Sequence, residues 1–349
     1  MRLVRCAAML LLAILNLTFI PACCCPFTSS GFVTRQGALL LRNGKPFRFV
    51  GVNCYRLTAY AENADEIFST LAMHGVRVAR FWAFQPLCGS ADCDFSKLER
   101  LLAAAKRYDI LLLPVLENHW SAGTFGEGVK PRDWYAEGWR TNAFGAARLS
   151  YRDFLLAVAA HFRDEPQILA WQLINEPEIY PDTEENFGVL RRFVWEAADA
   201  LKQADLNHLI SVGLLGLGQP STAGRKFRAL HDLRNIDLVS AHDHGYIYDP
   251  MPGRGWLVPA NVFYRDLCDA ASLDKPFLAT EAAIPLSWVN GNRKNRAELF
   301  RRKLNAFFSA GGTGYILWNY EPEPDTESGF DANDPVLELI GRTAGRLSS

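Results

Sequence analysis

The chain has 349 residues, of which 49% are hydrophobic and 21% charged, a composition typical of a folded globular protein that excludes intrinsic disorder. The formal net charge of -1 leaves no broad basic surface for a polyanion, so we expect no nucleic-acid partner.

The N-terminus has the pattern of an export signal. Arg2 and Arg5 precede an apolar run over residues 6–20, which is too short for a comfortable membrane span. The Ile-Pro-Ala-Cys sequence ending at Cys23 is similar to a bacterial lipoprotein site, with Cys23 as the lipid-bearing residue; cleavage without a lipid is the alternative. We therefore expect residues 1–25 to be a signal peptide or lipoprotein signal, and the protein to be secreted or anchored in the cell envelope.

Four cysteines lie beyond this region: Cys54, Cys88, Cys93 and Cys268. Cys88 and Cys93 flank a short polar loop and form a candidate disulfide in an oxidising compartment, whereas Cys54 and Cys268 suit free, buried thiols. The sequence has no cysteine or histidine cluster at zinc spacing, so we expect no metal.

A single domain is expected over residues 31–349, because this part has no linker, low-complexity tract or repeat. Short apolar runs alternate there with longer amphipathic stretches. The eight runs that predict buried strands are 47–52, 76–81, 110–116, 169–173, 209–212, 238–241, 277–279 and 315–317. The stretches that predict helices are 64–74, 95–108, 148–162, 187–204, 261–271 and 293–310.

This alternation predicts an α/β fold of the (β/α)8 TIM-barrel type, in which each of eight strands is followed by a helix. A doubly wound open sheet is the main alternative, but Gly51-Val52-Asn53-Cys54-Tyr55 lacks the glycine spacing of a phosphate-binding turn. An early hairpin over residues 31–45, turning at Asn43-Gly44, would close the bottom of the barrel.

In a TIM barrel the functional side chains gather where strands end, and polar or aromatic residues end most of the predicted strands. They are Arg80, Trp82, Asn118, His119, Asn175, Glu176, His242, His244, Tyr246, Glu281 and Trp318. Glu176 and Glu281 each come directly after an apolar strand, where a merely solvated glutamate is not expected. Two carboxylates are what glycoside hydrolysis requires, one to protonate the leaving oxygen and one to attack or to activate water.

Three segments carry a resemblance to a known family. Trp171-Gln172-Leu173-Ile174-Asn175-Glu176-Pro177 is similar to the Asn-Glu-Pro motif of clan A glycoside hydrolases, especially family 5. The segments 77–84 and 275–281 resemble those that bear the arginine and the nucleophile in family 5 mannanases. The similarity spans the chain after the signal region.

The resemblance implies a retaining hydrolase with Glu176 as general acid/base and Glu281 as nucleophile, and without a cofactor. Arg80 would keep Glu281 ionised, whereas burial and the second carboxylate would raise the pKa of Glu176. The expected substrate-binding residues are Arg80, Trp82, Asn118, His119, Asn175, His242, His244, Tyr246 and Trp318. We expect a monomer that acts on a β-linked polysaccharide or oligosaccharide, with β-1,4-mannan first, and with β-1,4-glucanase or exo-β-glycosidase activity as alternatives.

One departure from the family pattern affects the support of the nucleophile. The family commonly has His-x-Tyr after the sixth strand, but this chain has His242-Asp243-His244, with Tyr246 two residues further on. Either His244 or Tyr246 could therefore contact Glu281.

Two readings from other classes remain open. His242 and His244, with His119 and a carboxylate, could form a metal site as in an amidohydrolase-like barrel. A carbohydrate-binding envelope protein without catalysis could keep the same barrel, although the intact glutamate pair argues against it.

Overall fold

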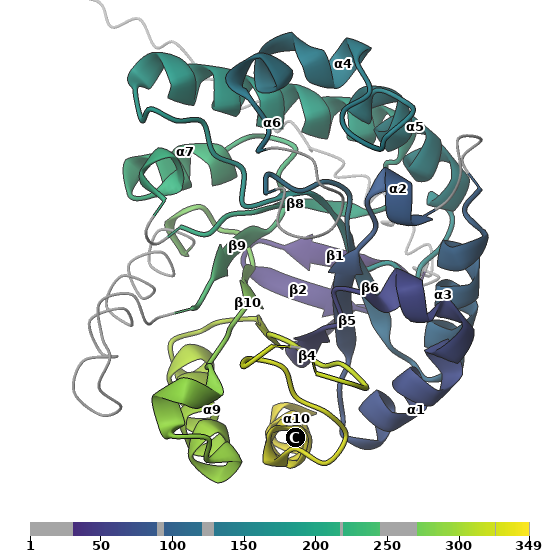
Figure 1. Ribbon diagram of the computed structural model, residues 1–349, viewed down its shortest axis with the longest axis vertical. Helices are drawn as coiled ribbons and strands as arrows, with labels where there is room; N and C mark the ends of the chain where they lie inside the picture. The colour runs from purple at the N-terminus through teal and green to yellow at the C-terminus, as the bar shows by residue number, and fades with distance from the viewer. Residues whose placement is uncertain are drawn as a thin grey trace, which may run out of the picture.

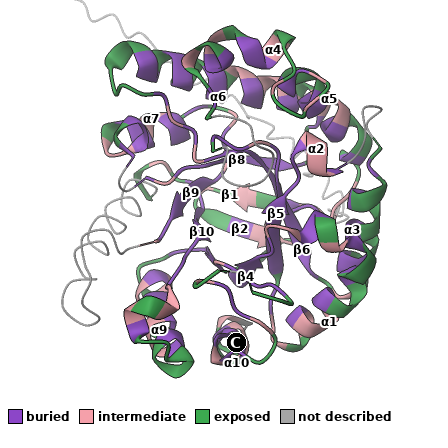
Figure 2. Ribbon diagram, viewed as in Figure 1, coloured by how far each residue is buried: buried purple, intermediate pink, exposed green. Residues whose placement is uncertain are grey.

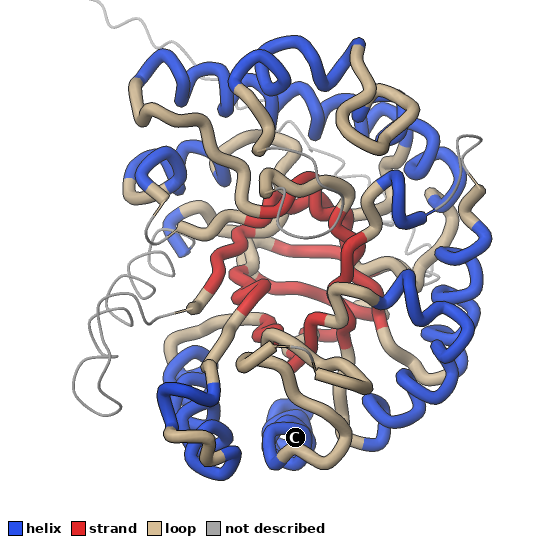
Figure 3. Tube along the Cα trace, in the orientation of Figure 1, coloured by secondary structure: helices blue, strands red, loops and turns tan. Residues whose placement is uncertain are grey.

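The computed structural model describes residues 31–88, 94–120, 129–216, 219–244, 271–324 and 326–348. Eight parallel strands form a ring inside a shell of helices (Figures 1 and 3). The ring strands are β4 (Phe49–Asn53), β5 (Val78–Trp82), β6 (Leu111–Val115), β7 (Ala170–Asn175), β8 (Leu209–Gly213), β9 (Val239–His242), β10 (Phe277–Glu281) and β11 (Gly314–Leu317). The expected (β/α)8 barrel is confirmed.

The ring closes between β8 and β9. The eight strands follow the order β8-β7-β6-β5-β4-β11-β10-β9, and a parallel bridge between Leu214, just after β8, and Ala241 of β9 joins the two ends of this order. Every residue of the eight strands is buried (Figure 2). Strands covered on both faces need continuous apolar runs rather than alternation, which explains why these segments stand out in the sequence.

The outer layer consists of helices with one apolar face (Figures 1 and 2). The α-helices are α1 (Ala64–Met73), α2 (Gln85–Cys88), α3 (Ser96–Arg107), α4 (Trp139–Thr141), α5 (Tyr151–Phe162), α6 (Glu184–Ala204), α7 (Arg225–His231), α9 (Arg293–Ser309) and α10 (Pro335–Ser348). Short 3-10 helices are η1 (Leu57–Asn63), η3 (Pro220–Thr222) and η4 (Leu286–Val289), and η2 (Trp134–Gly138) is a π-helix. Helices α7 and α10 were not predicted from the sequence, and the helix expected over 261–271 falls mainly outside the described residues.

A small antiparallel sheet of β1 (Val33–Gln36), β2 (Leu39–Arg42) and β3 (Lys45–Pro46) lies across one end of the ring. Val33 and Leu40 of this sheet share an apolar cluster with inward-facing residues of the ring strands. The segment makes two turns rather than the single turn that was expected: one at Asn43-Gly44 and another at Gly37, where φ is +58°. Glycine adopts this left-handed conformation without steric cost.

Two cysteine predictions meet different outcomes. Cys54 is a free, buried thiol as expected. Cys88 is also free and buried, so the candidate Cys88–Cys93 disulfide is not formed in this structure. The side chain of Cys88 belongs to the main apolar core. Cys93 and Cys268, like the predicted signal and Cys23, lie outside the described residues.

Within the part of the chain that the structure describes, no helix has the length and apolar character needed to cross a membrane. The longest, α6, is instead amphipathic, and Thr183 caps its start by accepting a hydrogen bond from the Asn186 amide at 3.2 Å.

Phe193 of α6 lies at the centre of an aromatic cluster between the helices and the loop after β6. It is fully buried, and its ring centroid lies 5.3 Å from that of Trp134, 5.1 Å from Tyr135 and 5.5 Å from Trp139. Edge-to-face and tilted contacts of this kind stabilise a core beyond simple burial of area.

We expect Phe193→Ala to lower the free energy of unfolding by about 3–5 kcal/mol, because it leaves a large cavity among these rings. Trp195→Ala, two residues further along α6, is the matched control, since its side chain is 48% exposed. Urea unfolding followed by circular dichroism measures both variants. Equal destabilisation by the two substitutions would contradict this account of the cluster.

Candidate active site

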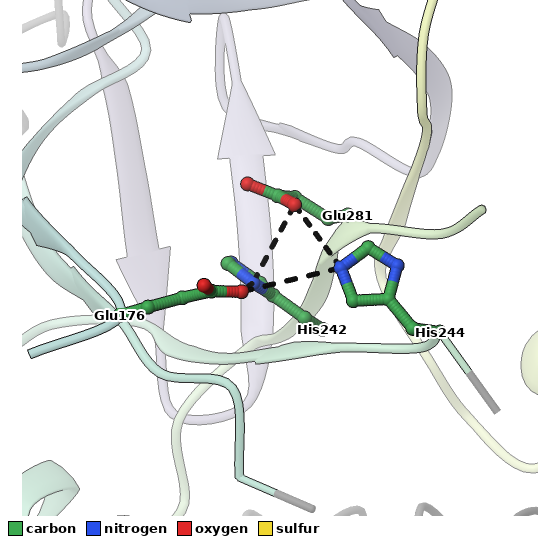
Figure 4. A group of neighbouring side chains, drawn as sticks. All are labelled: Glu176, His242, His244 and Glu281. Carbon is green, nitrogen blue, oxygen red and sulfur yellow. Dashed lines mark hydrogen bonds and ion pairs between the residues drawn. The ribbon is translucent and has the colours of Figure 1, made fainter. Parts of the chain in front are cut away.

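The carboxyl ends of the ring strands bring together two glutamates and two histidines (Figure 4). Glu176 directly follows β7, Glu281 is the last residue of β10, and His242 is the last residue of β9, two positions before His244. Side chains two residues apart on an extended segment point to the same side, which places both imidazoles at the glutamates.

Arg80 of β5 holds this end of the barrel together. Its fully buried guanidinium donates to Glu281 Oε1 at 2.6 Å, to Asn53 Oδ1 and Asn175 Oδ1 at 2.7 Å, and to Gln172 Oε1 at 2.8 Å. The four acceptors come from β4, β7 and β10. A buried guanidinium needs such partners, because an uncompensated charge in the interior is costly.

Glycine at position 213 makes room for this arrangement. A Cβ atom there would lie 2.7 Å from Gln172 Oε1, the acceptor of the Arg80 Nε hydrogen bond. Any larger residue would therefore push Gln172 away from Arg80.

Glu281 lies in a strongly cationic environment. Burial alone raises its pKa, but the charges of His242 and Arg80 and the hydrogen bond from His244 outweigh burial and hold the pKa well below its usual range. Its Oε2 atom lies 3.2 Å from His244 Nε2 and 3.6 Å from His242 Nδ1. The carboxylate is therefore ionised at neutral pH, as a nucleophile requires.

Glu176 has a left-handed backbone conformation, with φ at +46°. Its two oxygens have different partners: Oε1 lies 2.6 Å from His242 Nδ1, and Oε2 accepts a hydrogen bond from Trp120 Nε1 at 2.6 Å. The strained turn directs the carboxyl group between these two rings.

The prediction that the pKa of Glu176 is raised was wrong: in the structure it is lowered. Burial and the charge of Glu281 do raise the pKa, but the hydrogen bond and charge of His242, helped by His244, lower it by more. A distance of 2.6 Å between the carboxyl oxygen and the imidazole nitrogen requires a proton between them. The Glu176–His242 pair therefore holds one proton jointly.

The two carboxyl groups are close together. One oxygen of each, together with one ring nitrogen of each histidine, belongs to a set of atoms that all lie within 4.8 Å of one another. Retaining glycosidases have carboxyl groups about 5–5.5 Å apart, whereas inverting enzymes need about 6.5–9.5 Å to admit a water. The observed separation suits direct attack by one carboxylate.

The side chain of Asp243, between His242 and His244, points away from the glutamates and anchors the segment 242–244. Its carboxylate accepts from Lys303 Nζ at 2.8 Å and from the Tyr315 hydroxyl at 2.6 Å, and all three side chains are buried. Its amide also donates to the carbonyl of Glu281 at 2.6 Å. The position of His244 is thus fixed; Tyr246, the other residue suggested to support Glu281, lies outside the described residues.

Aromatic rings form a platform beside the glutamates. The Trp318 ring stacks on Tyr55, with centroids 5.3 Å apart and planes at 14°, and lies 6.2 Å from Trp82. Trp82 in turn stacks on Phe84 at 5.3 Å. The partly exposed face of Trp318 suits contact with the apolar face of a sugar.

The remaining predicted residues lie on the β6–β7 side. Asn175 donates to Asn118 at 3.2 Å, and Asn118 donates to the carbonyl of Trp120 at 2.7 Å. His119 is buried against the Tyr135 hydroxyl at 2.8 Å, and burial together with Lys130 lowers its pKa to about 4. His119 thus belongs to a neighbouring buried network rather than to the four-residue group of Figure 4.

The sequence analysis assigned no site role to several residues that shape this region: Tyr55, Trp120, Gln172, Asp243, Lys303 and Tyr315. Trp120 and Tyr55 could have been found, because both lie in the segments that follow the ends of β6 and β4. Gln172 and Lys303 give no such signal, since one lies mid-strand and the other on α9, 60 positions from Asp243.

Comparison with known proteins agrees with the predicted resemblance. A family model described as "GH family 5 beta-mannosidase-like" matches residues 156–260, which include Glu176 and His242. The predicted resemblance to glycoside hydrolase family 5 is confirmed.

Individual curated relatives carry the names of mannan-cleaving enzymes. Putative mannan endo-1,4-beta-mannosidase 4 of Arabidopsis thaliana is 30% identical over 263 residues, covering 61% of this chain and 62% of the relative. Mannan endo-1,4-beta-mannosidase 3 of the same plant is 27% identical over 352 residues, covering 84% and 82%. The chain spans about three fifths of the length of the first curated relatives that it matches.

Among solved structures, the endo-1,4-beta-mannanase of Rhizomucor miehei has a TM-score of 0.73 at 20% identity, covering 91% of this chain and 99% of that one. At this level of identity the similarity concerns the fold.

We expect Arg80→Met to raise the pKa of Glu281, because the permanent cation 2.6 Å from its carboxylate is removed. Carbon-13 NMR titration of the glutamate carboxyl carbons measures this directly. Arg107→Met, which removes the exposed partner of Asp65, is the control and should leave Glu281 unchanged. An unaltered Glu281 titration in folded Arg80→Met would show that Arg80 does not set its ionisation.

Proposed function

We propose that the protein is a retaining glycoside hydrolase that cleaves β-1,4-mannan by double displacement. The observation that carries the proposal is the pair Glu176 and Glu281, with carboxyl oxygens no more than 4.8 Å apart at the carboxyl end of a (β/α)8 barrel.

Glu281 attacks the anomeric carbon in the first step. Its carboxylate is already ionised, because Arg80 and the two histidines stabilise the negative charge. The attack forms a glycosyl ester with Glu281 while the bond to the leaving sugar oxygen breaks. Arg80 stays bonded to the other carboxyl oxygen and holds the ester in place.

Glu176 supplies the proton for the leaving oxygen. This proton is the one that Glu176 shares with His242. When the leaving oxygen of the substrate enters between Glu281 and the rings of Trp120 and His242, the proton shifts toward that oxygen. In the second step the Glu176 carboxylate takes a proton from water, which attacks the glycosyl ester and releases Glu281. His242 therefore acts as the proton reservoir of the acid/base.

Mannan is the first substrate choice because curated relatives of this chain are named mannan endo-1,4-beta-mannosidases. A neutral polymer also fits the stacked platform of Tyr55, Trp82 and Trp318, which offers ring faces instead of charges.

An exo-acting β-mannosidase is the second candidate, because the matching family model is described as beta-mannosidase-like. The distinction depends on whether the substrate cleft is open at both ends. The expected export, the candidate lipid anchor at Cys23 and the monomeric state remain proposals of the same kind.

The direct test is hydrolysis of mannan, glucomannan, carboxymethyl cellulose, mixed-linkage glucan and xylan, measured as reducing ends released. We expect activity on mannan and a loss of at least about 100-fold in Glu281→Ala, because the covalent step is removed. Glu178→Gln is the matched control. The Glu178 carboxylate accepts hydrogen bonds from Gln219 and Ser221, each at 3.4 Å, and these bonds do not involve Glu281.

Four outcomes would change the proposal. Release of mannose alone from the start would select the exo reading, and preferential cleavage of carboxymethyl cellulose would select a glucanase. Binding of mannan without turnover by the wild type would replace the enzyme with a carbohydrate-binding protein. An initial α-anomer in proton NMR of the products would exclude retention at a β-linkage.

The pH profile tests the ionisation of Glu281. Activity requires the ionised carboxylate, and a depressed pKa keeps it ionised in acid, so kcat/KM should stay high until the pH falls below about 4.3, the usual glutamate pKa. The loss on the alkaline side should follow removal of the proton shared by Glu176 and His242. An acid limb centred above about pH 5 in stable protein would contradict the proposed role of Arg80 and the histidines.

A further inference from the structure

The four side chains of Figure 4 have the composition and spacing of a transition-metal site. The four measured nitrogen–oxygen separations are 2.6 Å for His242–Glu176, 3.6 Å for His242–Glu281, 4.0 Å for His244–Glu176 and 3.2 Å for His244–Glu281. A tetrahedral zinc with ligands at 2.0–2.1 Å has ligand–ligand distances of about 3.3 Å. The observed separations scatter around this value.

The ligand atoms are already aimed inward because other groups hold the rest of each side chain. Glu281 offers Oε2 while Arg80 binds its Oε1 at 2.6 Å, and Glu176 offers Oε1 while Trp120 binds its Oε2 at 2.6 Å. Secondary contacts of this kind orient metal ligands and contribute strongly to affinity.

The histidines are fixed as well. The buried bonds from Asp243 to Lys303 and Tyr315 hold the backbone between His242 and His244. Little conformational entropy is therefore lost when a cation binds, since the four side chains are ordered beforehand.

We propose that Zn²⁺, or another divalent cation that prefers mixed nitrogen and oxygen ligands, binds reversibly to Glu176, His242, His244 and Glu281 and blocks the site. Mg²⁺ and Ca²⁺ do not bind there, because they require mainly oxygen ligands.

The inhibitory part of this inference rests on the proposed function. A cation bonded to Glu281 Oε2 takes the electron pair needed for attack, and its bond to Glu176 Oε1 removes the proton donor. The metal and the substrate therefore compete for the same site between Glu176 and Glu281. The charge of Arg80, 2.6 Å from Glu281, opposes a second positive charge and keeps the binding reversible by a chelator.

The experiment is calorimetric titration of the whole protein with ZnCl2 and, separately, with MgCl2, followed by anomalous diffraction from zinc-soaked crystals at the zinc edge. We expect one zinc site between the four side chains, no magnesium binding, and at least about 10-fold weaker zinc binding in His244→Gln. Glu281→Gln serves as a second test if His244→Gln unfolds, because it keeps the shape but loses the charge.

His161→Gln is the matched control, since His161 lies 2.7 Å from Glu99 in an exposed histidine–carboxylate pair. It should bind zinc like the wild type. Absence of zinc binding to the wild type, or zinc binding as tight as that of the wild type in both His244→Gln and Glu281→Gln, would overturn the metal site even if mannan hydrolysis is intact.

Hydrolysis is measured separately with rising ZnCl2 and then with added EDTA. Competitive inhibition that EDTA reverses supports the inference. Zinc binding at the four residues in a protein that hydrolyses none of the polysaccharides would keep the metal site and refute the proposed function instead.

Discussion

The buried guanidinium of Arg80 imposes the main constraint on the site. A charge inside the barrel is tolerated only when acceptors surround it, and here they come from three other strands: Asn53, Gln172, Asn175 and Glu281. The register of those strands must therefore bring the four acceptors to the same height along the barrel axis as the Arg80 guanidinium. The position of Glu281 follows from this requirement, as does the need for glycine at position 213 beside Gln172.

The two carboxylates differ in the kind of partner that each has. Glu281 is paired with Arg80, whose charge is permanent at any ordinary pH. Glu176 is bonded to a neutral indole, that of Trp120, and to the imidazole of His242, whose ring nitrogen can share a proton with the carboxylate. One carboxylate is thus held in a single ionisation state, while the other can give up and regain a proton. This difference supports the proposed roles of nucleophile for Glu281 and acid/base for Glu176 more strongly than burial does, because both groups are largely buried.

Much of this arrangement could be predicted from the sequence, and the physical reason lies in the barrel. Strands buried on both faces appear as apolar runs, so β5, β7 and β10 were located within about two residues, and Glu176 and Glu281 stood out as charges at their ends. The pKa shift of Glu176 was predicted in the wrong direction, because the sequence shows its burial but not the contact with His242 Nδ1. The buried thiol of Cys88 was missed for a similar reason, since its packing depends on the core around it.

The link between Asp243 and the outer layer could not be predicted from the sequence, yet it connects the site to the rest of the fold. Because alternate side chains of an extended segment point in opposite directions, two histidines that face the barrel axis force the residue between them to face the helices. A carboxylate there is buried and needs a cation, which Lys303 of α9 supplies at 2.8 Å. The packing of α9 against the barrel therefore determines where His242 and His244 meet the glutamates. The outer layer thus influences the geometry of the group formed by the two glutamates and the two histidines.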